Sequence, residues 1–218
     1  EYGNDWKKIQ PILISSGKIK GHYPCICGEK KNFRDCHLEI FQGLWKLKQD
    51  IFLNEVFSSL YGRDFCLTGG TALARFYLFH RESLDLDLFT HNQNVDFSQL
   101  NRFILSLAKK MDLKIGQQVL AETFLQYIFT DKKKKNLKID FVKDVGPRFG
   151  EIVIKKKVRL DSLENIAVNK VLTVFGRTEA KDFIDLYFLL KDKGFTLEDL
   201  ILKAKKKDLG LTEFYLAN

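Results

Sequence analysis

The sequence predicts an α+β fold, in which a mixed sheet with its helices, residues 38–155, is followed by a helical portion, residues 156–218. Short apolar runs that alternate with polar residues, as in strands, recur between residues 64 and 142. After about residue 160, apolar residues recur only at helical spacing. Hydrophobic residues make up 45% and charged residues 29% of the chain, which is enough for a packed core. Residues 1–37, interrupted by Gly and Pro, predict an irregular N-terminal segment.

Helices and strands are expected in turn along the first portion. Residues 38–60 carry apolar side chains at helical spacing, which predicts one amphipathic helix. Gly69 and Gly70 end a short strand, and Asp96 is placed to cap a helix. In chain order the expected elements are a helix at 38–60, a strand at 64–67, a helix at 71–79, a strand at 84–89, a helix from 97 to about 111, and strands at 113–121, 124–130 and 137–142, the last two joined by a lysine turn.

The second portion is predicted to contain three helices, at 166–175, 179–191 and 197–207. Asp161 followed by Glu164 has the pattern of a capping box in front of the first of them. In the second helix, an apolar stripe at i, i+3, i+4 and i+7 spacing is expected to face the core. The residues of this stripe are Phe183, Leu186, Tyr187 and Leu190.

The chain has no run of 18 or more apolar residues, so no transmembrane helix is expected. The first residues lack the basic start and apolar stretch of a signal peptide, which favours a cytoplasmic protein. Four cysteines in 218 residues do not indicate a disulfide framework. Cys25, Cys27, Cys36 and His37 do not have the usual spacing of a structural zinc site, so free or buried thiols are favoured there.

The formal net charge is +8, and lysines gather at 132–135, 155–157 and 203–207. A surface of this kind favours polyanions such as nucleic acid or nucleotides. Lysine runs are also common in solvated turns. Composition alone leaves both interpretations open.

Asp85 and Asp87 form the most informative pair in the sequence. In a strand, residues i and i+2 share one face, so these two carboxylates project together while Leu84, Leu86 and Leu88 occupy the opposite, buried face. Neighbouring carboxylates repel each other, and burying their charge is costly. A hard divalent cation between them removes this conflict, because Mg²⁺ is typically held by one or two carboxylates together with substrate phosphates and water.

A phosphate-binding turn is expected just upstream. Gly69 and Gly70 lead directly into a helix, and a backbone without Cβ atoms can approach a triphosphate closely. The free N–H groups and the dipole of the helix N-terminus favour anions, and Thr71 can add a hydroxyl. A Gly-Gly pair alone is usually only a turn. Here the Gly-Gly pair is followed by Asp85-x-Asp87, and the two motifs together are a more specific signal for a nucleotide site.

Asp140 is a candidate for a third acidic residue, because Ile139 and Phe141 alternate with it along a predicted strand. If this strand lies beside residues 84–89, Asp140 completes an acidic triad that can hold two metal ions about 4 Å apart. Either Asp140 or a metal-bound hydroxide can then deprotonate an attacking hydroxyl. The alternative is a solvated carboxylate on an exposed strand face.

The candidate positions outside this acidic group each have two interpretations. Arg81 can bind a phosphate bidentately, or it can pair with Asp85 or Glu82. Lys170 can face a cleft and neutralise triphosphate charge, or it can be solvated. Asp182 and Asp185 lie one turn apart on a predicted helix, and their spacing is equally compatible with surface salt bridges.

Together these segments resemble the AbiEii nucleotidyltransferase toxin family, which includes abortive-infection toxins of type IV toxin–antitoxin systems and the related MenT toxins. The resemblance covers about residues 40–192, with the motifs in the order of the family. The motifs that carry it are Gly69-Gly70-Thr71-Ala72-Leu73, His80-Arg81-x-Ser83-x-Asp85-Leu86-Asp87-Leu88, Lys170 and Arg177-x-x-x-Lys181-Asp182-x-x-Asp185-Leu186.

The resemblance implies a polymerase-β-like core that uses an NTP and Mg²⁺ (or Mn²⁺). It implies that Asp85 and Asp87 bind the metal and that Ser83 lies beside the nucleotide phosphates. Lys170 and an aspartate of the pair Asp182/Asp185 are implied as further essential residues. Family members are linked to nucleotide transfer onto RNA, including tRNA 3′ ends, and an antitoxin protein normally restrains them.

The resulting hypothesis is an enzyme that transfers a nucleoside monophosphate from an NTP to an acceptor hydroxyl of RNA, as the toxin of a toxin–antitoxin or abortive-infection system. Within the same class, the acceptor can instead be a protein or a small molecule. A different class is a non-catalytic module that binds RNA or a partner protein. The presence of both Asp85 and Asp87 argues against that module, because carboxylates repel polyanions.

Overall fold

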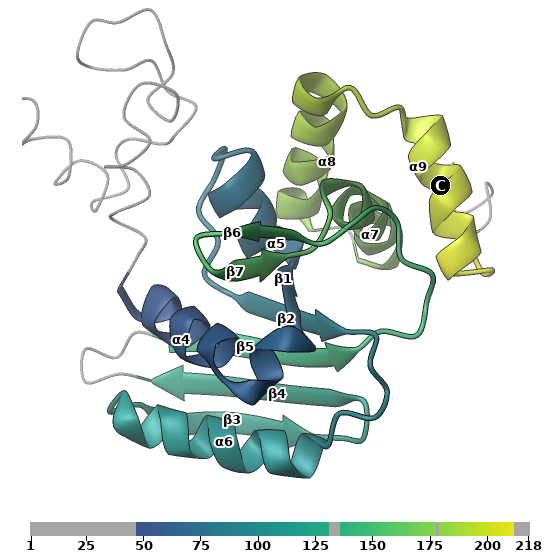
Figure 1. Ribbon diagram of the computed structural model, residues 1–218. Coiled ribbons are helices and arrows are strands. Elements are labelled where there is room, and N and C mark those ends of the chain that lie inside the picture. The colour runs from purple at the N-terminus through teal and green to yellow at the C-terminus, as the bar shows by residue number, and fades with distance from the viewer. Residues whose placement is uncertain (1–46, 131–135, 178, 212–218) are drawn as a thin grey trace, which may run out of the picture.

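The computed structural model describes residues 47–130, 136–177 and 179–211 (Figure 1). Its strands form one seven-stranded sheet in the order β3-β4-β5-β2-β1-β7-β6. They are β1 (Cys66–Thr68), β2 (Leu86–Thr90), β3 (Lys114–Leu120), β4 (Phe124–Thr130), β5 (Asn136–Lys143), β6 (Val153–Lys155) and β7 (Val158–Leu160). The pairs β2–β5 and β1–β7 are parallel and the other pairs are antiparallel. The predicted mixed sheet is therefore confirmed.

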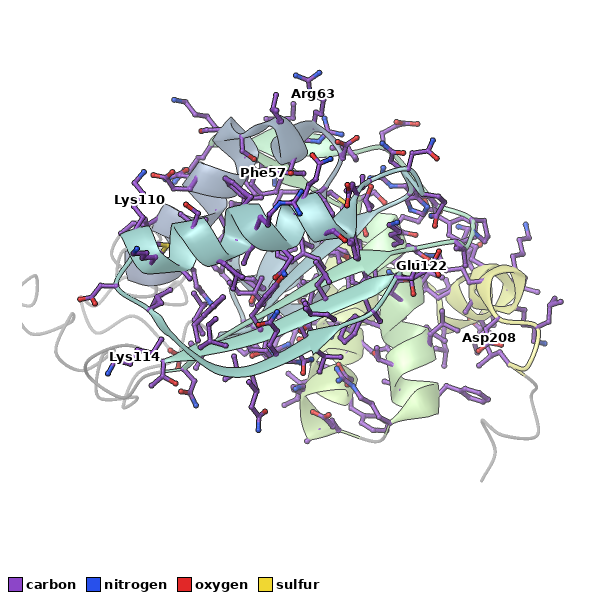
Figure 2. The ribbon with its side chains drawn as sticks, turned by 90° about the horizontal axis from the view of Figure 1, so that it is seen from below. Phe57, Arg63, Lys110, Lys114, Glu122 and Asp208 are labelled. Carbon is purple, nitrogen blue, oxygen red and sulfur yellow. The ribbon has the colours of Figure 1, made fainter. Side chains whose placement is uncertain are left out.

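Helices lie on both sides of this sheet. They are α4 (Leu47–Ser58), the 3₁₀ turn η1 (Leu60–Arg63), α5 (Gly69–Ala72), which continues into the π-helical turn η2 (Leu73–Tyr77), α6 (Phe97–Lys110), α7 (Leu163–Gly176), α8 (Ala180–Lys193) and α9 (Leu197–Lys207). In both views α4 and α6 cover one face, whereas α7 and α8 lie on the other side (Figures 1 and 2). The helical second portion thus packs against the face that α4 and α6 leave open.

The centre of the core lies along β2 and β5. Leu86, Leu88, Ile139 and Phe141 are all fully buried, with 0% of their surface exposed. Because successive side chains of a strand point to opposite faces, the polar residues between them face the side of α7 and α8. The expected burial of Leu84 is wrong, since it precedes β2 and is 58% exposed.

Helix ends follow the capping signals with one correction. Asp96 caps α6 as predicted, with its carboxylate accepting hydrogen bonds from the N–H groups of Ser98 and Gln99. At α7 the N-cap is Ser162 rather than Asp161, and its hydroxyl accepts from the N–H of Asn165 at 2.9 Å. Asp161 is buried one residue earlier, where its carboxylate binds several side chains instead.

The hairpin formed by β6 and β7 has no counterpart in the sequence prediction. The three residues of β6 are exposed, so the alternation that marks a half-buried strand is missing there. Its turn contains Lys156 and Lys157, and β7 pairs with β1 inside the main sheet. The hairpin therefore straddles the boundary expected at residues 155 and 156.

Helix α8 buries only half of the apolar stripe that was predicted to face the core. Leu186 and Leu190 are partly buried and pack against the core, whereas Phe183 and Tyr187 are 49% and 54% exposed. The buried face carries Asp182 and Asp185, each with 0% exposure. Ion pairs with residues of neighbouring segments hold this face inward, and they override the apolar pattern.

Several sequence predictions concern residues outside the described ranges. They are the start of the helix at 38–46, the lysine turn at 132–135, and Cys25, Cys27, Cys36 and His37.

Cys66 is a free thiol in β1, and burial raises the pKa of this thiol to about 12, as expected for a core residue. Within the described ranges, no helix is both long and apolar enough to cross a membrane.

Asp161 joins the sheet to the helical portion. Its carboxylate accepts hydrogen bonds from the Thr68 hydroxyl at 2.8 Å, the Asn165 amide at 2.7 Å and the Arg148 guanidinium at 3.2 Å. Only 1% of the residue is exposed, so water cannot replace these partners. The carboxylate thereby fixes the end of β1 relative to the start of α7.

We expect Asp161→Ala to lower the free energy of unfolding by about 3–5 kcal/mol, because it leaves buried donors and a guanidinium without their partner. Chemical denaturation monitored by circular dichroism measures this loss. Asp199→Ala is the matched control. Its carboxylate is 50% exposed in a pair with Lys203, so a loss below about 1 kcal/mol is expected. Equal losses in the two variants would contradict the structural role of Asp161.

Candidate active site

A cavity of about 570 Å³ lies between the sheet and α7. Asp85, Asp87 and Asp140 line it from the sheet side, and Lys170 and Arg177 line it from α7 and the residue after it. We call it the acidic cavity. Gly69, Gly70, Arg81 and Ser83 also line it, so the segments that the sequence singled out meet in one place.

The three carboxylates meet because of the strand register. Asp87 of β2 lies directly opposite Asp140 of the parallel strand β5, and Thr68 of β1 lies opposite Asp87 on the other side. Asp85 precedes β2 by one residue, so the argument that two residues of one strand share a face does not apply to it strictly. It nevertheless lines the same cavity. Asp85, Asp87 and Asp140 thus line one cavity, whereas their role as metal ligands stays a prediction.

The charges of these carboxylates are poorly compensated. Burial, together with the negative charges of Asp140 and Asp85, raises the pKa of Asp87 to about 6. Asp140 forms an ion pair with Lys138 at 3.0 Å through Oδ2. Its Oδ1 is buried and has no hydrogen-bond partner among the described residues. A buried carboxylate oxygen in this state is satisfied only when a cation or a donor binds in the cavity.

Close packing requires glycine at the two positions where a phosphate-binding turn was predicted. Gly69 has φ +65°, and a Cβ there would collide with the carboxylate of Asp87. A Cβ on Gly70 would lie 2.5 Å from the Arg81 guanidinium and 3.0 Å from the Ser83 hydroxyl. Any side chain at either position would therefore displace residues of the cavity wall, quite apart from any bound phosphate.

The segment carrying Ser83 and Asp85 is fixed from behind. Thr71 is fully buried, and its hydroxyl donates to the Asp85 carbonyl and lies 2.9 Å from the Ser83 hydroxyl. Gln49 of α4 donates to the Leu84 carbonyl at 2.7 Å. Thr71 does not line the cavity, so the structure gives its hydroxyl a positioning contact instead of the predicted open phosphate-binding position.

A buried ion cluster forms the opposite wall. Lys170 Nζ lies 2.7 Å from Asp182 Oδ1 and 2.8 Å from Asp185 Oδ2. Arg177 pairs with Asp182 at 3.1 Å. Arg81 binds Asp185 bidentately, at 2.6 and 2.7 Å. Lys170, Arg81 and Arg177 line the acidic cavity, whereas the two aspartates stand behind them.

This cluster corrects two interpretations of the sequence. Arg81 pairs with Asp185, so the expected pairing with the side chain of Asp85 or Glu82 is wrong, whereas phosphate binding by Arg81 stays a prediction, since Arg81 also lines the cavity. Asp182 and Asp185 are completely buried and are not part of surface salt bridges. Burial alone would raise the pKa of Asp185, but hydrogen bonds from Arg81 and His80 and the charge of Lys170 hold this pKa far below its usual range. Asp185 is therefore ionised and keeps its cations in place.

The donor set of the acidic cavity suits a hard divalent cation only in part. Carboxylate oxygens are the ligands that Mg²⁺ prefers, and the unpartnered Oδ1 of Asp140 and the raised pKa of Asp87 both favour a cation there. Over the described ranges, no three acidic, His or Cys side chains lie close enough together to hold one ion between them. A bound ion thus needs further ligands, which substrate phosphates and water commonly supply.

Sequence reasoning missed several residues of this site. Lys138 lines the cavity and lies two residues before Asp140 on the same strand face, so the alternation of β5 could have indicated it. Asn169 lines the cavity beside Lys170. His80 Nε2 lies 2.6 Å from Asp185 Oδ1, and no sequence signal predicts the pairing of residues so far apart in the chain.

A comparison with protein families identifies the kind of protein. The family described as nucleotidyl transferase AbiEii toxin, type IV TA system, matches residues 51–217. An uncharacterized protein of Aquifex aeolicus (strain VF5), aq_aa25, is 27% identical over 170 residues, which is 74% of this chain and 75% of that protein.

Two crystal structures from Helicobacter pylori share the fold. One, described as a candidate nucleotidyltransferase, has a TM-score of 0.54 and 22% identity, covering 78% of this chain and 76% of its own. The other, JHP933, has a TM-score of 0.53 and 23% identity, covering 72% of this chain and 69% of its own. At these identities the likeness establishes the fold alone.

We expect Asp87→Asn to stabilise the ligand-free protein near pH 7.5, because it removes a carboxylate that is ionised against its neighbours. The folded-state pKa of about 6 lies above the 3.8 of an unperturbed aspartate, so the destabilisation by ionised Asp87 is absent below about pH 4 and complete above about pH 6. The stabilisation by Asn should therefore shrink as the pH falls from 7.5 to 4.5. Thermal unfolding at several pH values measures it, and a gain independent of pH would contradict this origin.

We expect Lys170→Met to lower the free energy of unfolding by about 3–5 kcal/mol, because Asp182 and Asp185 then remain buried with one cation fewer. Urea denaturation measures the loss. Lys181→Met is the control, since this lysine is 42% exposed and pairs only at the surface with Glu179. Its loss should stay below about 1 kcal/mol. A Lys170 variant as stable as the control would show that the cluster does not depend on this cation.

Proposed function

The chain belongs to the AbiEii nucleotidyl transferase toxin family, and from this premise we propose that it transfers a nucleoside monophosphate from an NTP to a hydroxyl group of RNA. Nucleotidyl transfer is the activity of the family, and the nucleotidyltransferase fold supports it. The acceptor, the metal and the antitoxin partner are our proposal. The observation that carries it is the pairing of Asp87 with Asp140, whose Oδ1 lacks a partner, in a cavity with a cationic opposite wall.

We assign phosphate binding to one wall of the acidic cavity and metal binding to the other. The cationic wall, with Lys170, Arg177 and Arg81, binds the triphosphate, whose charge the nearby carboxylates alone would repel. Ser83 and the backbone at Gly69 and Gly70 lie beside it and can donate hydrogen bonds to phosphate oxygens. Asp182 and Asp185 take no direct part, since they hold the cations from behind.

Asp85, Asp87 and Asp140 are the residues that would hold Mg²⁺ or Mn²⁺, and substrate phosphates and water would supply the remaining ligands, since the three carboxylates do not by themselves converge on one ion. When bound, this ion neutralises charge that develops on the phosphate oxygens. The acceptor hydroxyl oxygen attacks the α-phosphorus, and the bond from that phosphorus to the oxygen bridging it to the β-phosphorus breaks. Pyrophosphate leaves in line with the attack. The proton of the hydroxyl moves to the carboxylate of Asp140.

RNA is the acceptor class that the charge of the protein favours. The net charge is +8, and Lys138 and Lys181 stand at the acidic cavity in addition to the three cations of its wall. A polyanion gains from each of these contacts through counterion release, whereas a neutral small acceptor does not. Within RNA we propose the 3′-hydroxyl of tRNA, a proposal that rests on the family resemblance. An antitoxin protein is the regulatory partner that the type IV family implies.

We expect labelled nucleotide to appear on a discrete RNA band when the protein is incubated with total RNA, Mg²⁺ and each α-³²P NTP in turn. Asp87→Ala should lower this transfer roughly 10³-fold, because the metal contributes several kcal/mol and each 1.4 kcal/mol is a factor of ten. Asp199→Ala, which removes a surface carboxylate, should transfer at the wild-type rate. EDTA should abolish the label.

Three outcomes would contradict the proposal. Label on protein or on a small molecule would show that the acceptor is not RNA. Binding of RNA without any label would indicate a non-catalytic module. Transfer that persists in Asp87→Ala and in EDTA would exclude the acidic cavity as the site of reaction.

A further inference from the structure

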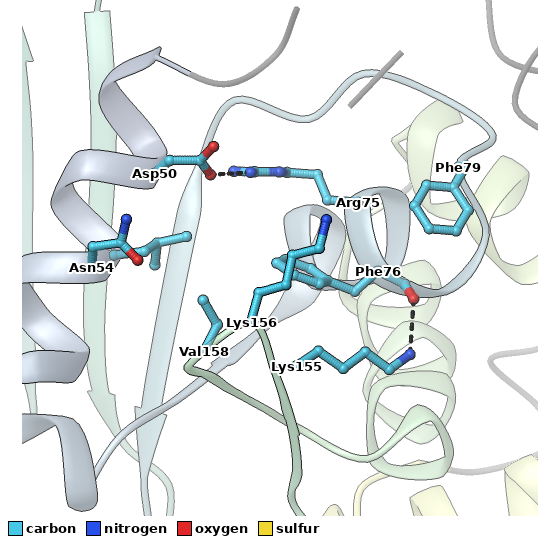
Figure 3. A pocket seen from close by; sticks show the side chains of 9 residues that line it. Asp50, Asn54, Arg75, Phe76, Phe79, Lys155, Lys156 and Val158 are labelled. Atoms are coloured by element: carbon cyan, nitrogen blue, oxygen red, sulfur yellow. Dashed lines mark hydrogen bonds and ion pairs between the residues drawn. The ribbon is translucent and has the colours of Figure 1, made fainter. Parts of the chain in front are cut away.

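A second cavity, of about 460 Å³, lies between α4, η2 and the β6–β7 hairpin (Figure 3). Its lining combines aromatic and aliphatic side chains with basic ones: Phe76, Phe79, Leu53, Arg75, Lys155 and Lys156 are the residues that matter below. We call it the hairpin cavity. Its volume is within the range of small-ligand sites, and it shares no lining residue with the acidic cavity.

The basic side chains of this cavity are placed by local contacts. Lys155 donates to the Phe76 carbonyl at 3.1 Å, and its ammonium lies 4.6 Å from the centre of the Tyr77 ring. Figure 3 shows Lys155 and Lys156 reaching from the hairpin toward η2. Arg75 is paired with Asp50, so that pair adds no net charge. The net positive charge of the lining thus comes from the two lysines, which favours one or two phosphate groups.

The turn that presents the lysines has an unusual backbone. Lys156 and Lys157 have φ of +50° and +67°, the left-handed region that two-residue hairpin turns require and that Gly or Asn normally occupies. Two lysines there cost conformational energy that the sequence could avoid. Of these two lysines, Lys156 lines the hairpin cavity, so its unfavourable backbone is explained if its ammonium group binds a ligand there.

Phe79 also has a left-handed backbone, with φ +55°. Phe76 and Tyr77 pack against the core, but Phe79 is not among the described residues that do so. Its half-buried ring lines the hairpin cavity. A large aromatic side chain held in a strained conformation beside a cavity is suited to stack on a planar group.

The two cavities are neighbours through short pieces of chain. The helical segment α5–η2 joins them, since Gly69 and Gly70 at its start line the acidic cavity and Phe76 near its end lines the hairpin cavity. Phe79 and Arg81 are two residues apart and line one cavity each. Gln49 accepts a hydrogen bond from Arg75 at 3.1 Å and donates to the Leu84 carbonyl, so it connects the hairpin cavity to the segment before Asp85.

We propose that the hairpin cavity binds an unpaired nucleotide of the acceptor RNA strand, upstream of the end that reacts. The base stacks on Phe79 against the apolar lining, and the adjacent phosphates bind Lys155 and Lys156. This inference rests on the proposed function, because it needs RNA as the acceptor.

The proposal is tested by the affinity of the full chain for a fluorescent single-stranded oligoribonucleotide, measured by anisotropy over a range of salt concentrations. Phe79→Leu, which keeps apolar bulk but removes the ring, should weaken binding roughly 5- to 100-fold, the range found for loss of one stacked base. Phe79→Tyr should restore it. An oligonucleotide that lacks the stacking base should bind wild type and Phe79→Leu equally.

The lysines are tested with a double variant, Lys155→Ala/Lys156→Ala. If both contact phosphates, the slope of log affinity against log salt should become shallower by about 1.4, since each contact on a single strand contributes about 0.7. The matched control is Lys109→Ala/Lys114→Ala, since these lysines lie in the last turn of α6 and at the start of β3, the edge strand opposite β6 (Figure 2 labels Lys114). This variant removes the same charge and should leave the slope within experimental error of wild type.

The failure of this inference is distinguishable from that of the proposed function. If wild type binds and labels the RNA, but Phe79→Leu and the Lys155/Lys156 variant bind it as tightly as wild type, the hairpin cavity is not an RNA site. If the Lys109/Lys114 variant loses as much slope, the effect is general charge and the inference also fails. If wild type is stabilised by NTP with Mg²⁺ but binds no oligoribonucleotide, both the acceptor and this inference are wrong.

Discussion

The interaction on which the site depends is the buried ion cluster between α7 and α8. Two carboxylates without exposed surface, Asp182 and Asp185, are tolerable only because Lys170, Arg81 and Arg177 surround them. The same cations line the acidic cavity. The residues that neutralise the buried aspartates are therefore also those that we propose to bind the triphosphate. The cluster also explains why α8 turns polar residues inward and leaves Phe183 and Tyr187 exposed.

On the sheet side of the acidic cavity, negative charges lie together without enough cations to neutralise them. Asp87 and Asp140 are held side by side by the parallel pairing of β2 and β5, and the pKa of Asp87 rises because Asp140 and Asp85 add to the effect of burial. A fold that maximised its own stability would not keep this pair. Such conflicts are typical of functional sites, where binding of substrate and metal relieves them. The carboxylates that destabilise the free protein are thus those assigned to the chemistry.

One short stretch of chain serves both cavities. Between Phe79 and Asp85 the chain presents an aromatic ring to the hairpin cavity and then a guanidinium, a hydroxyl and a carboxylate to the acidic cavity. Gln49 and Thr71 hold this stretch from two sides. Its rigidity matters because nucleotidyl transfer depends on the position of the reacting groups more than on covalent chemistry by the protein.

The sequence by itself determined the mixed sheet, most element bounds and the candidate aspartates Asp85, Asp87 and Asp140, because strand alternation and glycine-rich turns are local signals. That Asp140 lies beside Asp87 was decided by the parallel pairing of β2 with β5, which joins segments far apart in the chain. It did not predict the β6–β7 hairpin, whose exposed strand lacks alternation, or the N-cap role of Ser162. Only the tertiary structure decided that Arg81 pairs with Asp185 and that Asp182 and Asp185 are buried. Arg81 and Asp185 come from segments about 100 residues apart. The cost of burying a charge depends on the residues that surround it in the folded protein, and a local sequence pattern does not contain that information.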